Sequence, residues 1–149
     1  MRILTKLLCV PLVLALYGCG TYRMKGIDQS NESQVATLNA SSASPAVFVH
    51  SIDGEAIGFG LQNNFQLLPG RRVLTILGNT QMMLYASPTN VVVNVVPKRR
   101  YQMVLRQVPR TPEWSVEIVD IQTNERADSH QSPANCTRSL AGNLSCTAN

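Results

Sequence analysis

Trp114-Ser115-Val116-Glu117-Ile118 alternates apolar and polar side chains, and this alternation decides the fold class. A period of two is typical of a β-strand with one face against a core and the other in water. We therefore expect Trp114, Val116 and Ile118 to share an inward face. Arg72-Val73-Leu74-Thr75-Ile76-Leu77 has a similar character, so such strands recur along the chain.

Short apolar pieces separated by turn residues extend from Ala46 to Gln122, and no stretch there makes a convincing amphipathic helix. The expected strands are Val47 to Ile52, Glu55 to Phe59, Asn64 to Leu68, Arg72 to Leu77, Gln81 to Tyr85, Val91 to Val96, Tyr101 to Arg106 and Trp114 to Ile121. Seven or eight short strands predict an all-β fold, a small antiparallel β-sandwich.

Two turn signals set the register of these strands. Asp53-Gly54 fits a tight hairpin because Gly adopts the positive φ that such turns require, and in Pro69-Gly70 the proline presets φ. Val91 to Val96 is apolar except at Asn94. This predicts a central strand buried on both faces, with a face covered by a partner protein as the alternative.

Length and charge limit the classes of protein. The chain has 149 residues and a formal charge of +4, and removal of residues 1–18 would leave about 131 residues, the size of one domain. That removal takes away Arg2 and Lys6, so 11 basic residues remain against 9 acids and the charge falls to +2. So weak a charge argues against nucleic acid as a partner.

The first residues have the layout of a secretory signal. Arg2 and Lys6 precede an almost wholly apolar run from Leu7 to Tyr17, and Gly18 follows. At about 1.5 Å per residue this run covers roughly half of a bilayer core of about 30 Å, too little for an ordinary spanning helix. We expect removal of residues 1–18 during export.

Leu16-Tyr17-Gly18-Cys19 resembles the lipobox of bacterial lipoproteins, with Leu three residues and a small residue one residue before the cysteine. The resemblance implies cleavage before Cys19 and acylation of Cys19, a stable membrane anchor without a cofactor. In that family a residue other than Asp after the cysteine, here Gly20, favours the outer over the inner membrane. The alternative is an ordinary signal peptide and a soluble periplasmic protein with an unpaired Cys19.

Polar composition predicts irregular segments on both sides of the sandwich. We expect a flexible tether over residues 19–45, in which Val35 to Leu38 could dock as a short edge strand, the sandwich over 46–123 and an irregular tail over 124–149. Cys136 and Cys146 have nine residues between them, so an oxidising compartment could join them in a disulfide. Two free thiols or a pair of metal ligands are the alternatives.

The order of features from Ala46 to Gln122 resembles PEGA-like surface modules, immunoglobulin-like or transthyretin-like sandwiches of bacterial envelope lipoproteins. The features are Ser51-Ile52-Asp53-Gly54, Leu67-Leu68-Pro69-Gly70-Arg71, Tyr101 and Trp114. This resemblance covers about half of the chain and implies a fold rather than an activity.

Candidate chemistry is sparse. His50 could pair with Asp53, and an enzyme would need them to converge with Ser51 or Ser115, but we expect no catalytic and no metal site.

The remaining candidates are two basic clusters, Arg71-Arg72 and Lys98-Arg99-Arg100. They either stand in water and discourage edge pairing, or lie at one end of the sandwich and contact an anionic lipid, lipopolysaccharide or an envelope protein. The sequence thus predicts a non-enzymatic, membrane-anchored envelope module, with a periplasm-facing small-ligand carrier as the alternative and a hydrolase after that. The sequence leaves the oligomeric state open.

Overall fold

Strands dominate the structure. The computed structural model describes residues 20–44, 46–58, 62–78, 88–107, 114–133, 135–138 and 144–147. In these ranges the one helical element is a short 3-10 helix, η1 (Glu32–Gln34). The strands are β1 (Thr21–Arg23), β2 (Ala36–Asn39), β3 (Val47–Ile52), β4 (Glu55–Ala56), β5 (Asn64–Leu67), β6 (Gly70–Gly78), β7 (Thr89–Val95), β8 (Arg100–Gln107), β9 (Trp114–Asp120), β10 (Glu125–Arg126), β11 (Asp128–Pro133), β12 (Asn135–Arg138) and β13 (Leu144–Thr147). The all-β prediction is confirmed.

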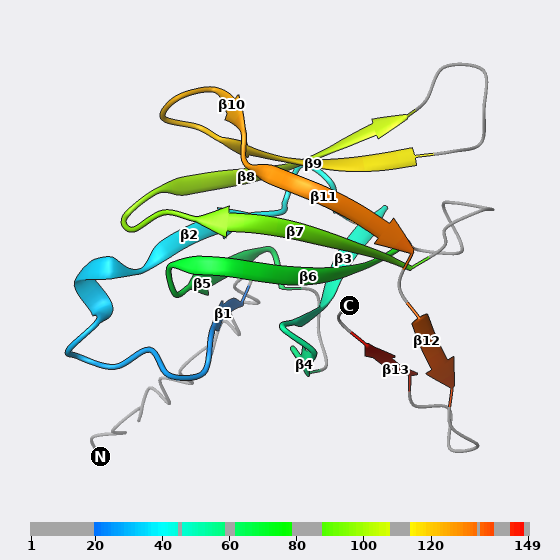
Figure 1. Cartoon of the computed structure of the whole chain (residues 1–149), viewed down its shortest axis with the longest axis horizontal. Helices are drawn as coiled ribbons and strands as arrows, with labels where there is room; N and C mark the ends of the chain where they lie inside the picture. The colour runs from blue at the N-terminus through cyan, green and yellow to red at the C-terminus, as the bar shows by residue number, and fades with distance from the viewer. Residues whose placement is uncertain are drawn as a thin grey trace, which may run out of the picture.

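Two sheets face each other as a sandwich (Figure 1). Sheet A has the strand order β1-β5-β2-β8-β9-β10 and sheet B has the order β11-β7-β6-β3-β4, while β12 and β13 pair separately. Most neighbours are antiparallel, but β1 runs parallel to β5 and β2 runs parallel to β8. The sandwich prediction is therefore confirmed, whereas the expectation of purely antiparallel pairing is wrong for these two pairs.

The predicted strands largely coincide with the observed ones. Val47 to Ile52 is β3 with the same bounds, and the strands predicted at Val91 and at Trp114 are β7 and β9 with slightly different ends. The strand predicted from Glu55 is shorter than expected, because β4 ends at Ala56. The strand predicted from Gln81 to Tyr85 lies outside the described residues.

Residues 20–44 contain two strands of sheet A where a flexible tether was expected. β2 lies between β5 and β8, and its Ala36 and Leu38 are 0% and 1% exposed. Tyr22 of β1 packs against the same core. The tether prediction is wrong for this segment, and β2 is a central strand rather than the docked edge considered from sequence. Its pairing with β8, which is distant in the sequence, cannot be predicted from the composition of the segment.

Both predicted turns are present, and they do different jobs. Asp53 and Gly54 have φ values of 52° and 82°, which makes a tight two-residue connection between β3 and β4. Gly70, with φ 108°, follows Pro69 where the chain passes from β5 in sheet A to β6 in sheet B. The first turn closes a hairpin, whereas the second joins the two layers.

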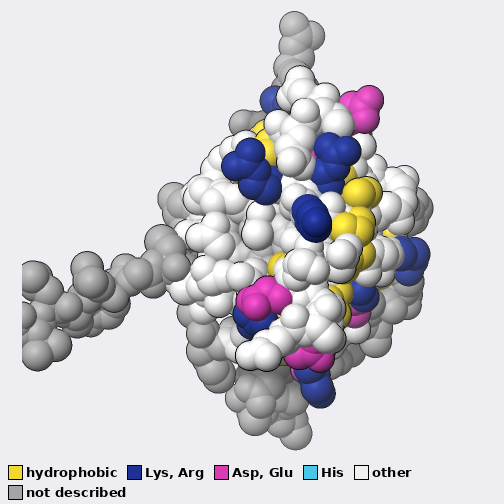
Figure 2. Space-filling model, turned by 90° about the vertical axis from the view of Figure 1, so that its left-hand side faces the viewer, with side chains coloured by type: hydrophobic (Ala, Val, Ile, Leu, Met, Phe, Trp, Pro, Cys, Tyr) yellow, Lys and Arg dark blue, Asp and Glu magenta, His cyan; other side chains and the backbone are white. Residues whose placement is uncertain are grey.

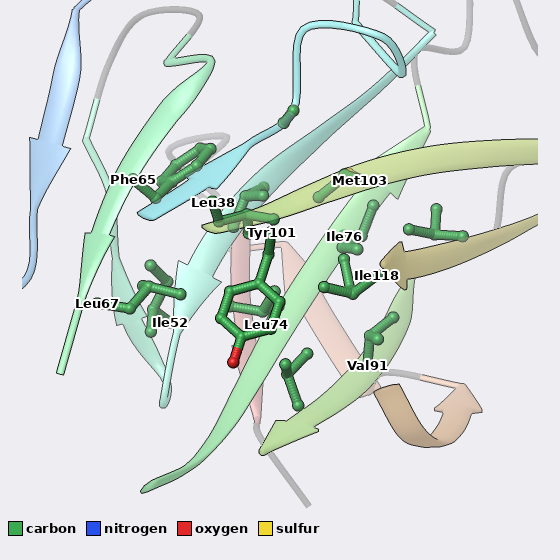
Figure 3. Close-up of a cluster of buried hydrophobic side chains, with 14 of the residues drawn as sticks. Leu38, Ile52, Phe65, Leu67, Leu74, Ile76, Val91, Tyr101, Met103 and Ile118 are labelled. Atoms are coloured by element: carbon green, nitrogen blue, oxygen red, sulfur yellow. The ribbon is translucent and has the colours of Figure 1, made fainter. Parts of the chain in front are cut away.

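The core lies between the facing sheets (Figure 3). Sheet A contributes Leu38, Phe65, Tyr101, Met103 and Ile118, which point toward side chains of sheet B, and all five are at most 2% exposed. The facing side chains from sheet B include Val47, Ile52, Leu74, Ile76 and Val91. Alternation along each strand explains this division, because every second residue points inward.

β7 confirms the prediction of a strand buried on both faces. Val91, Val92 and Val93 are at most 4% exposed and Asn94 is exposed, while Val96, the last residue of the predicted strand, lies beyond β7 and is 48% exposed. The strand pairs on one side with β6 and on the other with β11.

The tail from residue 124 is more regular than expected. It contains β10 at the edge of sheet A and β11 at the edge of sheet B, followed by β12 and β13. Asp128 at the start of β11 accepts a hydrogen bond from the Ile118 amide of β9 at 2.8 Å. The expectation of an irregular tail is wrong here, because β11 satisfies the main chain of β7 at the sheet edge.

Candidate functional site

The two basic clusters lie at the same end of the sandwich. Gly70 at the start of β6 is opposite Val95 at the end of β7, and Lys98 lies in the connection from β7 to β8. Figure 2 faces this end and shows Lys and Arg side chains beside exposed hydrophobic ones. Val96, which is 48% exposed, is in the same connection. The clusters thus share one end, as the second of the two alternatives requires, while contact with a partner stays a prediction.

Two of the five predicted contact residues, Arg72 and Arg99, form ion pairs within the fold. Arg72 is 3.0 Å from Asp53 Oδ2 and donates to the main-chain oxygens of Leu68 and Pro69 at 2.9 and 2.7 Å. Arg99 pairs with Asp120 at 3.6 Å. Within the described part of the chain, Arg71, Lys98 and Arg100 are exposed and form no ion pair. These three cations remain available to an anionic partner.

A groove on the outer face of sheet A, which we call the sheet A groove, was not predicted. Its volume is about 390 Å³, and its lining comes from β1, β2, β5, the start of β8 and Ile121. The polar side chains that line it are Thr21, Thr37, Asn39, Asn64, Gln66 and Arg100. Leu38, Phe65 and Tyr101 also line it, but their side chains point into the core, so main chain forms the floor there.

Strand register arranges the polar side chains of the groove in two rows. Thr21, Asn64 and Asn39 are successive cross-strand neighbours, and so are Gln66, Thr37 and Arg100. Asn39 Nδ2 donates to Asn64 Oδ1 at 2.8 Å, which fixes the two amides against each other. The Oδ1 of Asn39 also accepts from the main-chain and side-chain donors of Ser41.

Arg100 is the charged side chain of the sheet A groove, and none of the described lining residues is acidic. The neighbouring cations on this face are paired, Arg23 with Glu32 at 3.1 Å and Arg106 with Glu117 at 3.0 Å. The groove therefore combines amides, hydroxyls and one guanidinium without a carboxylate partner. Such a set donates hydrogen bonds to an anion and exchanges them with hydroxyl groups.

The sequence did not predict the groove, because β1 and β2 belong to the segment that was expected to be a flexible tether. The available signal was short: Ala36-Thr37-Leu38-Asn39 alternates apolar and polar residues, which is the pattern of a half-buried strand. Register with β5 and β8, which creates the rows, is a property of the folded chain.

A second hollow, of about 310 Å³, lies at the basic end between β7, β8, β9 and β10. Arg99 pairs there with Asp120 and Arg126 lies 2.6 Å from Asp128, while Glu125 of the lining forms no ion pair among the described residues. Tyr101 Oη accepts a hydrogen bond from the Val96 amide at 2.8 Å, and burial raises the pKa of this phenol. These contacts hold both arginines of the described lining, so the hollow offers an anionic ligand no unpaired cation.

The catalytic and metal candidates do not converge. Asp53 accepts hydrogen bonds from Arg72 and the Val73 amide, so it serves the turn rather than His50. Ser51 lies on β3 in sheet B, whereas Ser115 lies on β9 in sheet A. Within the described residues no group of His, Cys, Asp and Glu side chains could hold a metal ion.

The described residues include the predicted cysteine pair but not the predicted anchor. The lipobox residues Leu16, Tyr17, Gly18 and Cys19 lie outside the described residues. Among the described ranges, no helix has the length and apolar character needed to cross a bilayer. Cys136 and Cys146 are directly opposite each other on β12 and β13, and Cys146 is 8% exposed.

Comparison of the chain with protein-family models, curated proteins and solved structures gives no match. The resemblance to the lipobox and to PEGA-like modules therefore stays a prediction.

Proposed function

We propose that this protein is exported, cut before Cys19, acylated on that cysteine and held on the envelope membrane as a non-enzymatic binding module. The observation that carries the proposal is the position of β1, which begins at Thr21, two residues after Cys19. The folded domain thus starts where the expected signal peptide ends. Cleavage before Cys19 would leave every described strand intact.

Gly20 adds a structural reason for the residue that follows the cysteine. A Cβ atom built on Gly20 would lie 2.4 Å from Gln62 Oε1, so a larger residue would displace the Gln62 side chain. The same glycine, not being Asp, favours the outer membrane under the lipobox resemblance. Packing therefore favours a small residue at this position, and sorting to the outer membrane disfavours Asp.

Binding rather than catalysis is supported by the surface chemistry. Arg71, Lys98 and Arg100 are exposed cations, and the sheet A groove offers oriented amides and hydroxyls. A nucleophile, a base and an acid within hydrogen-bond reach would be needed for hydrolysis. Asp53, the acid considered with His50, is held by Arg72 and the Val73 amide, which supports a binding role over a hydrolase.

Intact mass of the membrane-extracted full chain, with fractionation into soluble, inner-membrane and outer-membrane pools, tests the anchor. We expect loss of residues 1–18 and a gain of acyl mass, both abolished by Cys19→Ala. The matched control is Cys9→Ala, which changes a cysteine of the signal run and should leave acylation intact. A mature chain without acyl mass in the soluble pool would contradict the proposal and favour a free periplasmic carrier.

A further inference from the structure

We infer that the sheet A groove binds the phosphate- and hydroxyl-bearing headgroup of a lipid in the membrane that holds the protein. This inference rests on the proposed anchor at Cys19 and names the partner of the domain at that membrane. It concerns a surface formed by β1, β2, β5 and β8, which meets the basic end at Arg100.

Position is the first argument. Thr21 lines the groove and is two residues from Cys19, so at most about 7 Å of extended chain separates them. Thr21 is also held in register opposite Asn64 at the edge of sheet A, which fixes the groove relative to the anchor. A domain with so short a link cannot rise above the headgroup layer, and the groove opens within reach of it.

Donor chemistry is the second argument. Phosphate oxygens only accept hydrogen bonds, and the groove presents donors: the Arg100 guanidinium, the Thr37 hydroxyl and the Asn64 amide. Because Asn64 Oδ1 accepts from Asn39, the Nδ2 group of Asn64 is directed away from that bond and can donate elsewhere. Gln66 supplies both a donor and an acceptor for headgroup hydroxyls.

Charge and apolar contact fit the same partner. Arg100 is exposed and has no ion pair among the described residues, so an anion at this point meets an unneutralised cation. Ile121, which is 46% exposed, lines the groove beside it and offers an apolar contact to the glycerol region of a lipid. Cations next to apolar side chains are typical of surfaces that dock on anionic membranes.

Arg71 is less suited to the same headgroup. It lies on β6 in sheet B, whereas the described lining of the groove comes from strands of sheet A and Ile121. Arg71 therefore provides a matched control: an exposed arginine at the start of β6 that should not contact the headgroup.

Native mass spectrometry of the full chain extracted from membranes, with phosphatidylglycerol or phosphatidylcholine added, tests the inference. Phosphatidylglycerol carries a net negative phosphate and two hydroxyls, whereas phosphatidylcholine carries a compensating cation and no headgroup hydroxyl. We expect phosphatidylglycerol to bind about fivefold to tenfold more tightly. Arg100→Gln should abolish that preference, and Arg71→Gln should keep it.

Thermal unfolding of both variants checks that each is folded, and both positions are exposed. Equal retention of the two lipids, or an equal loss of preference in both variants, would overturn the inference. The same spectra report the acyl mass on Cys19. An acylated chain without lipid preference defeats the inference alone, whereas a chain without acyl mass that still selects phosphatidylglycerol defeats the proposed anchor alone.

Discussion

Asp53 and Val73 are joined by two hydrogen bonds: the Asp53 amide donates to Val73 O, and the Val73 amide donates to Asp53 Oδ1, each at 2.8 Å. The other carboxylate oxygen of Asp53 accepts from Arg72 at 3.0 Å. The turn between β3 and β4 is thereby tied to β6, and one aspartate both shapes the turn and holds an arginine of the basic end.

Asp53→Ala should lower the free energy of unfolding by about 1–3 kcal/mol, because it leaves the partly buried Val73 amide and Arg72 without their acceptor. The φ of 52° at this position also favours Asp over Ala. Urea unfolding measures the change. Glu55→Ala, at an exposed pair 3.9 Å from Lys25, is the control and should have little effect; equal losses in both variants would contradict the structural role of Asp53.

Leu38→Ala should cost about 2–5 kcal/mol, as expected for a buried leucine whose site cannot collapse fully. Leu38 is 1% exposed in β2. Its neighbour Thr37 is exposed, and Thr37→Ala should change stability by less than about 1 kcal/mol. Chemical denaturation of the two variants separates a central strand from a flexible tether, since a tether would make both substitutions neutral.

Asp128 should make stability depend on pH in the acid range. Burial disfavours its charged form, but hydrogen bonds from Arg126, the Ile118 amide and Gln131 outweigh burial and lower its pKa. A lowered pKa in the folded state contributes stability above the unfolded value of about 3.9, and this contribution disappears as pH falls through the folded pKa.

Asp128→Asn should therefore reduce stability at neutral pH, by about 1–3 kcal/mol, and flatten the loss of stability below about pH 4. Melting temperatures measured from pH 7 to pH 2.5 follow this change. Glu125→Gln, on exposed β10, should retain the pH dependence of the unmodified protein. A pH profile unchanged by Asp128→Asn would show that other carboxylates govern acid unfolding.

Cys136 and Cys146 should form a disulfide under oxidising conditions. They are cross-strand partners on β12 and β13, and directly opposed residues of an antiparallel pair have the Cα separation that a disulfide requires. Mass spectrometry with and without reduction should differ by two hydrogens, and alkylation should label this pair only after reduction. Labelling without reduction would contradict the bond.

The Cys136→Ser, Cys146→Ser double variant should loosen the β12 and β13 hairpin and leave the unfolding of the main sandwich nearly unchanged. The reason is that β12 and β13 form a sheet of their own. Limited proteolysis would follow the hairpin, and thermal unfolding would follow the sandwich.

Local alternation was sufficient to predict β9, a strand with one inward face, although the shorter alternation of β2 was not recognised. Val116 and Ile118 are 1% and 0% exposed, while Ser115 and Glu117, which alternate with them, are partly exposed, as the pattern of β9 predicts. The Asp53-Gly54 turn was equally predictable from the sequence, because few residue types adopt a positive φ. These features depend on interactions between residues close together in the sequence.

The sequence by itself determined the all-β class, the positions of β3, β7 and β9, the tight turn and the candidate anchor at Cys19. Only the tertiary structure decided that β2 is central, that β1 leaves almost no link to Cys19, and that Thr37, Gln66 and Arg100 form a row. The physical reason is that these outcomes depend on parallel and antiparallel pairing between segments far apart in the chain. Such pairing buries short polar-flanked strands whose own composition resembles a loop.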